Sequence, residues 1–214
     1  MSQTTGFAQF MNEMESVQLS EGMDVWHSKL DADGRFTVGA LRRAIDKMRE
    51  PHIQLPDFTW SNVVPIKVNC FIWRAIQRRI PTLTALRERG VETLTNFCSA
   101  CINEKEDVDH LLISCPHAVT IREILFRWCG IPITDFHSVI ELHEFINNWG
   151  QNVRRRDRLR AVCYGLLWGV WKFRNERAFN NVFYSPSQCA DRIISMVHLW
   201  SKSRSKCGSI AWEE

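Results

Sequence analysis

Four side chains able to bind one metal ion lie close together in the sequence, at Cys98, Cys101, His110 and Cys115. Their spacing is C-x2-C-x8-H-x4-C, and three thiols with one imidazole are the donor set of a tetrahedral structural zinc site. Four protein ligands leave no position for water or substrate, so the predicted Zn²⁺ stabilises the fold and performs no chemistry. Buried core cysteines or a redox CxxC pair are the alternatives, but neither explains the third cysteine and the histidine.

The other cysteines indicate a reducing compartment. Cys70, Cys129, Cys163 and Cys189 lie in apolar segments with helical spacing and are expected in the core, whereas Cys207 lies in a polar tail. Unpaired cysteines beside a zinc set are typical of intracellular proteins, so we expect a nuclear or cytoplasmic location. The first residues lack the pattern of a secretory signal, and no run of about 18 apolar residues predicts a membrane span.

Apolar residues recur at helical spacing through most of the chain, which predicts a mainly α fold. One exception is expected near Asp33-Gly34, where Trp26, Phe36 and Val38 flank a turn signal and predict a small N-terminal β-hairpin. Residues 1–20 contain a candidate short helix, and residues 107–114 a helical turn that carries His110. The further predicted helices cover residues 39–49, 66–79, 84–89, 117–129, 138–149, 154–175 and 186–202.

These patterns predict three parts: an N-terminal segment at residues 1–20, a helical zinc-stapled domain at 21–130, and a helical C-terminal extension at 131–214. Charge is spread unevenly over them, because residues 151–214 contain 12 basic and 5 acidic side chains in a chain whose net charge is +3. Such asymmetry predicts a basic surface that meets a polyanion. No feature of the sequence sets the oligomeric state.

Basic residues are concentrated in two predicted helices. Arginine can donate two parallel hydrogen bonds to a phosphate, so these side chains are candidate contacts for nucleic acid. The alternative is that they merely solvate a hydrophobic helix or cover Trp149 with their alkyl stems. The candidates are Lys67, Arg74, Arg78 and Arg79 in the earlier helix, and Arg154, Arg155, Arg156, Arg158 and Arg160 in the later one.

An ordered series of motifs resembles the zinc-binding domain that follows the polymerase in plant LINE-type, non-LTR retrotransposon reverse transcriptases. The similarity covers about residues 24–130, and the segment 167–179 is similar to the tail found after that domain. One departure lies shortly after the last zinc ligand, where the family often has a tryptophan and this chain has Ile121 or a neighbouring residue instead. The motifs are Trp26, Gly34-Arg-Phe-Thr-Val38, Trp60, Pro65-x-Lys67, Phe71-x-Trp73-Arg74, Ile80-Pro81-Thr82, Leu86, Arg89-Gly90, Cys98-x2-Cys101, Glu106-Asp107-x-Asp109-His110-Leu111 and Cys115-Pro116.

The resemblance implies a non-catalytic accessory module that contacts RNA or single-stranded DNA. Polymerase chemistry needs a tyrosine followed by paired aspartates, but neither Tyr164 nor Tyr184 is followed by Asp, so we expect no enzyme activity. The alternative is a domesticated protein-interaction or structural module, and a third possibility is a non-functional element fragment. Glu104, Glu106, Asp107 and Asp109 make the zinc loop acidic. That acidity favours a protein partner there and places any nucleic-acid contact on the arginine helices.

Overall fold

A computed structural model describes residues 11, 14–15, 27–30, 33–49, 58 and 60–204 of the chain. The chain divides into two compact units, Met1–Gln54 and Leu55–Glu214, and each is described by itself. Most of the helix predicted within residues 1–20 lies outside the described residues. Of the helices that the structure describes, none is long and apolar enough to cross a membrane.

The first unit contains helix α2, Val38–Arg49, and not the predicted β-hairpin. The chain does turn there, since Ser28 N donates to Gly34 O at 2.7 Å, but residues 27–30 and 33–49 contain no strand. Thr37 caps α2 by accepting a hydrogen bond from Ala40 N, and helical geometry therefore begins at Val38. An isolated two-stranded hairpin is only marginally stable, so this part of the chain forms the capped helix instead. Trp26 lies outside the described residues.

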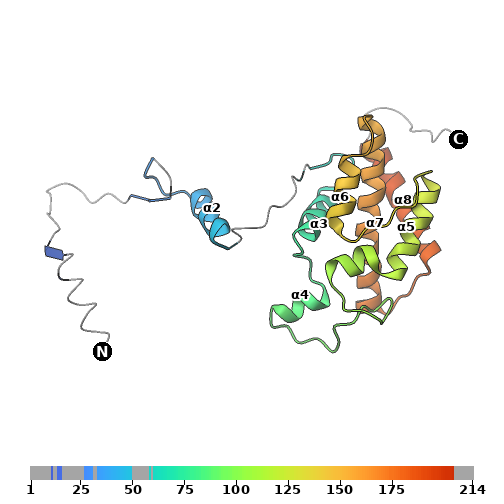
Figure 1. Cartoon of the computed structure of the whole chain (residues 1–214), viewed down its shortest axis with the longest axis horizontal. Coiled ribbons are helices and arrows are strands. Elements are labelled where there is room, and N and C mark those ends of the chain that lie inside the picture. The colour runs from blue at the N-terminus through green and yellow to red at the C-terminus, as the bar shows by residue number, and fades with distance from the viewer. Residues whose placement is uncertain are drawn as a thin grey trace. The chain divides into compact units, whose positions relative to one another are not determined.

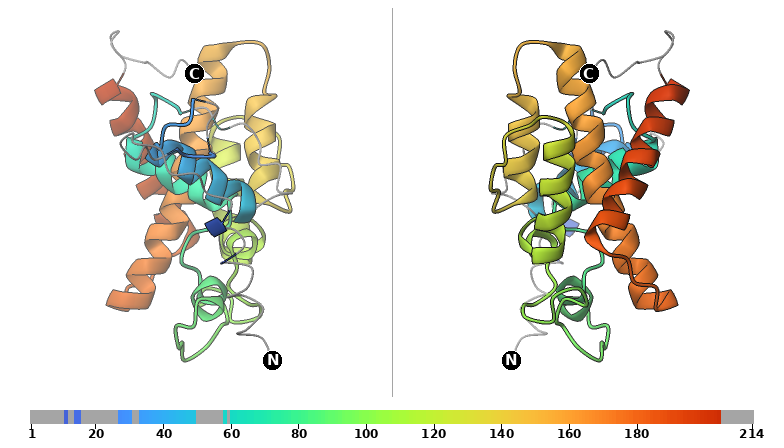
Figure 2. Two further views of the ribbon diagram at one scale, coloured as in Figure 1. Left: turned by 90° about the vertical axis from the view of Figure 1, so that its left-hand side faces the viewer. Right: turned by 90° about the vertical axis from the view of Figure 1, so that its right-hand side faces the viewer.

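The second unit is built from helices packed around α7, Val153–Asn180, which is 28 residues long (Figures 1 and 2). Helices α3, α5, α6 and α8 and the π-helix η1 all pack against α7, so this fold is mainly helical as predicted. The only β-pairing among the described residues is an isolated bridge between Phe97 and Lys105. The remaining elements are α3 Ile66–Ile76, α4 Leu83–Glu88, η1 His110–Ser114, α5 Pro116–Trp128, α6 Val139–Asn147 and α8 Pro186–Arg204.

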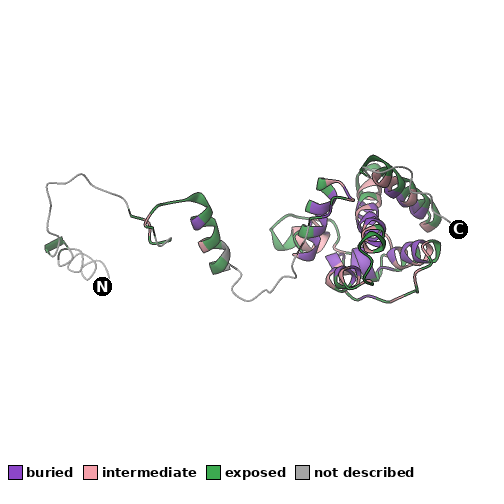
Figure 3. Ribbon diagram, turned by 90° about the horizontal axis from the view of Figure 1, so that it is seen from above, coloured by how far each residue is buried: buried purple, intermediate pink, exposed green. Residues whose placement is uncertain are grey.

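Helix α7 is central because its middle is apolar on nearly every side. Residues 161–171 of this helix are all buried except Trp168, and Figure 3 shows buried residues on the inner sides of the surrounding helices. Two glycines let α8 approach closely: a Cβ at Gly165 would lie 2.5 Å from Val197 Cγ2, and one at Gly169 would lie 2.6 Å from Ile193 Cγ1.

The predicted C-terminal extension is part of the same compact unit as residues 55–130 of the predicted zinc domain. Helix α8 packs against α5 as well as α7, and α6 packs against both α3 and α7. The boundary at residue 130 therefore does not separate two bodies of the structure. That it marks the edge of a sequence module stays a prediction.

Candidate metal centre

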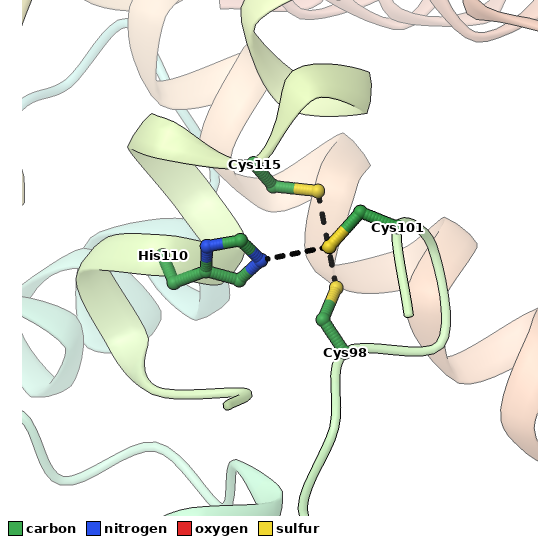
Figure 4. Close-up of side chains that lie close together, drawn as sticks. All are labelled: Cys98, Cys101, His110 and Cys115. Carbon is green, nitrogen blue, oxygen red and sulfur yellow. Dashed lines mark hydrogen bonds between the residues drawn. The ribbon is translucent and has the colours of Figure 1, made fainter. Parts of the chain in front are cut away.

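The four predicted ligands converge on one point (Figure 4). Their ligand atoms lie within 4.8 Å of one another, with Cys98 Sγ 3.8 Å from Cys115 Sγ and Cys101 Sγ 3.2 Å from His110 Nε2. Zinc–sulfur bonds of about 2.3 Å in a tetrahedron place two sulfurs roughly 3.8 Å apart. The donor set and its spacing therefore fit a zinc ion with four ligands from the protein.

A tight backbone turn brings Cys98 and Cys101 together. Ile102 N donates to Cys98 O at 2.8 Å, and Cys98 N donates to Glu104 O at 2.8 Å, which folds the loop back on itself. The turn requires a φ of +62° at Ile102. A β-branched residue in the left-handed region is strained, so the loop tolerates a local cost in order to aim two thiols at one point.

The second pair of ligands is positioned by the π-helix η1. Asp107 Oδ1 accepts from His110 N at 2.7 Å and starts the turn, and Cys115 N donates to His110 O at 2.7 Å across five residues. Pro116 follows, which disfavours helical geometry at Cys115; that residue accordingly has φ −58° and ψ 130°. The wide π turn thus places His110 and Cys115 on the same side, as such turns often do at functional sites.

One thiol of the site, that of Cys98, is prepared to lose its proton. A hydrogen bond from the Cys115 thiol lowers the pKa of Cys98 to about 4, and backbone N–H groups of Ala100 and Cys101 act in the same direction against the cost of burial. The same shared proton raises the pKa of Cys115, with burial adding to the rise. A cation would take the place of that proton, because zinc binds the thiolate form.

Glu104 approaches the zinc-site histidine from outside. Its Oε2 lies 3.0 Å from His110 Nδ1, although the two atoms do not meet the geometry of a hydrogen bond. A carboxylate behind a metal-binding histidine orients the ring and leaves the other nitrogen for the metal.

Comparison with known proteins supports this assignment. Residues 36–121 match the family model described as zinc-binding in reverse transcriptase, a match that covers less than half of the 214-residue chain and includes all four ligands. No curated protein and no solved structure gives a significant match to the chain. The chain therefore contains a zinc-binding domain of this type, with Cys98, Cys101, His110 and Cys115 clustered as its zinc site.

A buried ion pair ties the zinc loop to α7, and sequence reasoning missed it. Glu106 is 0% exposed, and Arg174 of α7 donates to it from Nε at 3.1 Å and from a terminal nitrogen at 2.6 Å. Glu106 Oε1 also accepts from Leu83 N, which begins α4. Arg177, one turn further along α7, donates to Ser99 O within the Cys98–Cys101 turn. A charged residue on the apolar stripe of α7 was the available signal, but the partner could not be identified from spacing.

The acidic residues that the sequence places in the zinc loop make contacts within the fold. Asp109 pairs with Arg78 at 2.5 Å and also accepts from Val139 N at the start of α6. Asp107 caps η1, Glu104 faces His110, and Glu106 is buried against Arg174. All four acidic residues therefore have contacts within the fold, although Glu104 and Asp107 are also exposed.

The two predicted basic sets lie apart along α7. Lys67 sits over the ring of Trp168 at 6.0 Å, and Arg78 at the end of α3 reaches Asp109 in the zinc loop. Arg154 precedes Trp168 by 14 residues on one helix, about 21 Å at 1.5 Å per residue. A short segment of a partner molecule would therefore not contact both sets of basic residues at once.

Several of the candidate residues have internal partners. Arg160 pairs with Asp157 at 2.7 Å and donates to Asn147. Arg74 donates to Arg79 O, and Arg79 has further interactions. Arg156 is half-buried, whereas Arg154, Arg155 and Arg158 are exposed. Arg158 has a further interaction, so Arg154 and Arg155 are the strongest remaining candidates for a contact with a partner.

Proposed function

We propose that this chain is a non-catalytic accessory module of reverse-transcriptase origin, of the plant LINE-type, non-LTR class, that binds RNA or single-stranded DNA through the start of α7. One observation carries the proposal: Arg154 and Arg155 are exposed and have no ion pair with any residue that the structure describes. They are held on a helix that the zinc-stapled core fixes in place. Their guanidinium groups can each donate two hydrogen bonds to a phosphate.

Helix stability does not account for these arginines. The positive end of the helix macrodipole lies at the N-terminus, so cations there are unfavourable by about 0.3–1 kcal/mol each. The first turn of α7 has no acidic residue to offset them. An anionic partner would be attracted both by the arginines and by the helix end. The excess of basic residues over residues 151–214 supports the same interpretation.

The donor set of the metal centre supports a structural role. All four zinc positions come from protein, and Cys98, His110 and Cys115 are buried, so a substrate has no approach to the ion. Thiolate ligands that need reducing conditions also support an intracellular location, nuclear or cytoplasmic.

A protein-interaction module remains the second candidate. The sequence suggested it through the acidic zinc loop, whereas the structure favours it through exposed apolar residues. The acidic residues of the zinc loop are paired internally, but apolar side chains around it are exposed: Ile102 is 75% exposed, and Leu94 and Phe97 are also exposed. Exposed apolar residues that lie together are a common feature of protein interfaces.

Binding of labelled single-stranded RNA, measured by fluorescence anisotropy at about 50 mM and about 200 mM salt, tests the proposal. We expect measurable affinity that falls steeply with salt. Changing Arg154, Arg155 and Arg158 together to glutamate should weaken binding at least about tenfold, because phosphate contacts carry the affinity. The charge-matched control changes the exposed Arg87, Lys105 and Lys172 to glutamate, with zinc content checked in both proteins. Equal loss in both triple variants, or no RNA binding by the wild type, would contradict the proposal.

A further inference from the structure

A hollow of about 300 Å³ lies where α5 ends, α6 ends and α7 begins. One wall is the first part of α7, and the other is formed by Trp149 together with Cys129, Gly130 and Ile131. Its volume is at the lower end of the range for small-ligand sites, which suits one flat group better than a large molecule. Among the described residues that line it, none is acidic.

The α7 wall changes from charged to apolar along a single stripe. Arg155, Arg158, Leu159 and Val162 follow one another at helical spacing, so their side chains share a face. The two arginines are exposed, whereas Leu159 and Val162 are 4% and 2% exposed. Exposed charged side chains and buried aliphatic side chains therefore line this wall together.

The opposite wall is aromatic and uncharged. The Trp149 ring packs against Phe145 with centroids 4.9 Å apart, which holds it in position beside the hollow. Burial raises the pKa of Cys129 to about 11, so this thiol is neutral at physiological pH and adds no charge. A ligand that fits this site has a flat apolar part beside a negative charge.

We infer that the hollow receives one base of a single-stranded nucleic acid, with the base beside Trp149 and the neighbouring phosphate on Arg155 and Arg158. This inference rests on the proposed function and specifies it further. Bases in a duplex are paired and stacked within the helix, so only a single strand presents a base that can enter. Stacking on an aromatic side chain tolerates any base, and the site therefore selects strandedness and not sequence.

Two oligonucleotides of about ten nucleotides separate base binding from phosphate binding. One is oligothymidylate, and the other is an abasic oligodeoxynucleotide that carries the same phosphates without bases. Anisotropy titrations should show the wild type binding oligothymidylate about tenfold more tightly than the abasic strand, and more tightly than a DNA duplex of equal length. Trp149→Ala should remove the preference for bases, while the affinity for the abasic strand stays unchanged.

Further variants keep the outcome clear if Trp149→Ala proves unstable. Ile131→Trp fills the hollow without removing an arginine and should also abolish the preference, whereas Trp149→Phe should keep most of it. Lys172→Gln, which removes a charge outside the hollow, is the control for net charge and should leave the preference intact. Zinc content and the circular dichroism spectrum are compared for every variant.

The possible results show whether the base-binding inference fails alone or together with the proposed function. Equal binding of both strands by the wild type, with a steep salt dependence, would overturn the base-binding inference and leave the phosphate contact standing. A base preference that survives both Trp149→Ala and Ile131→Trp would also overturn the inference, because the base would then bind elsewhere. No binding of either strand, with an acidic aromatic peptide bound instead, would overturn the inference and the proposed function together.

Discussion

The two ends of α7 use the same side chain in opposite ways. At the C-terminal end, Arg174 is buried and donates to the fully buried Glu106, and Arg177 donates to Ser99 O in the zinc loop. At the N-terminal end, Arg154 and Arg155 are exposed, with no ion pair in the described part of the chain. The difference lies in the neighbouring elements and not in the arginines, so a count of basic residues does not predict which of them is available to a partner.

Loss of a zinc ligand should have the largest effect on stability. It should disrupt the zinc loop that the C-terminal end of α7 contacts. Structural zinc contributes about 10–16 kcal/mol of apparent binding free energy at pH 7. We expect Cys115→Ser to lose zinc in metal analysis and to lower the Tm by at least about 10 °C. Cys70→Ser, at an exposed cysteine outside the site, is the control. If the purified wild-type protein contains no zinc and a chelator leaves its Tm unchanged, the zinc site is wrong.

Breaking the buried ion pair should be the next largest effect. Arg174→Met leaves the buried Glu106 carboxylate without its positively charged partner, and such changes cost about 3–5 kcal/mol of unfolding free energy. Adding Glu106→Gln to the variant should restore part of this loss, which urea denaturation measures. Arg177→Gln removes the hydrogen bond to Ser99 O and a cation–π contact with Phe183 but leaves no buried charge unpaired, so it should cost only about 1 kcal/mol. Equal losses for Arg174→Met and Arg177→Gln would mean that the buried pair has no special role.

The middle of α7 fixes the separation of its two ends, and its glycines are sensitive to substitution. Alanine normally stabilises a helix interior relative to glycine by about 1 kcal/mol. At Gly165 the added Cβ would lie 2.5 Å from Val197 Cγ2, so we expect Gly165→Ala to destabilise the protein by about 1–3 kcal/mol instead. Adding Val197→Ala should relieve the clash. A Gly165→Ala protein more stable than wild type would contradict the close packing of α7 on α8.

Relief of strain in the zinc loop should have the smallest effect, and it should be stabilising. Ile102 has φ +62° and an exposed side chain, so Ile102→Gly removes strain and little packing. We expect a gain of about 1 kcal/mol, seen as a small rise in Tm. Ile102→Val keeps the β-branch and should give no such gain. A less stable Ile102→Gly protein would show that the turn is not strained at this residue.

Local features were the ones that sequence could predict. Helical periodicity placed α3, α5, α7 and α8 with errors only at their ends, and the ligand spacing predicted four side chains that the structure brings together. Both are short-range properties that one stretch of chain determines. The predicted hairpin failed because the Asp33-Gly34 turn signal competed with the Thr37 cap of α2, and the local pattern did not show which would prevail.

Long-range pairings could not be predicted. Glu106 and Arg174 are 68 residues apart, and in the sequence Glu106 is one of several acidic residues in a loop. Asp109 likewise meets Arg78 and Val139 only after α3 and α6 have packed. The hollow beside Trp149 is formed by the ends of three helices, so no single segment encodes it.

Two single variants compared in parallel, Arg155→Gln and Arg174→Gln, test the central claim about α7 most directly. Each protein is measured for RNA affinity at about 50 mM salt and for the rate of zinc release to a chelator. We predict that Arg155→Gln weakens RNA binding several-fold and leaves zinc release unchanged, because it removes a phosphate contact far from the metal. Arg174→Gln should speed zinc release and leave the RNA affinity of the zinc-bound protein unchanged. Variants that alter both properties together, or the reverse pairing of effects, would contradict this division of roles between the two ends of the helix.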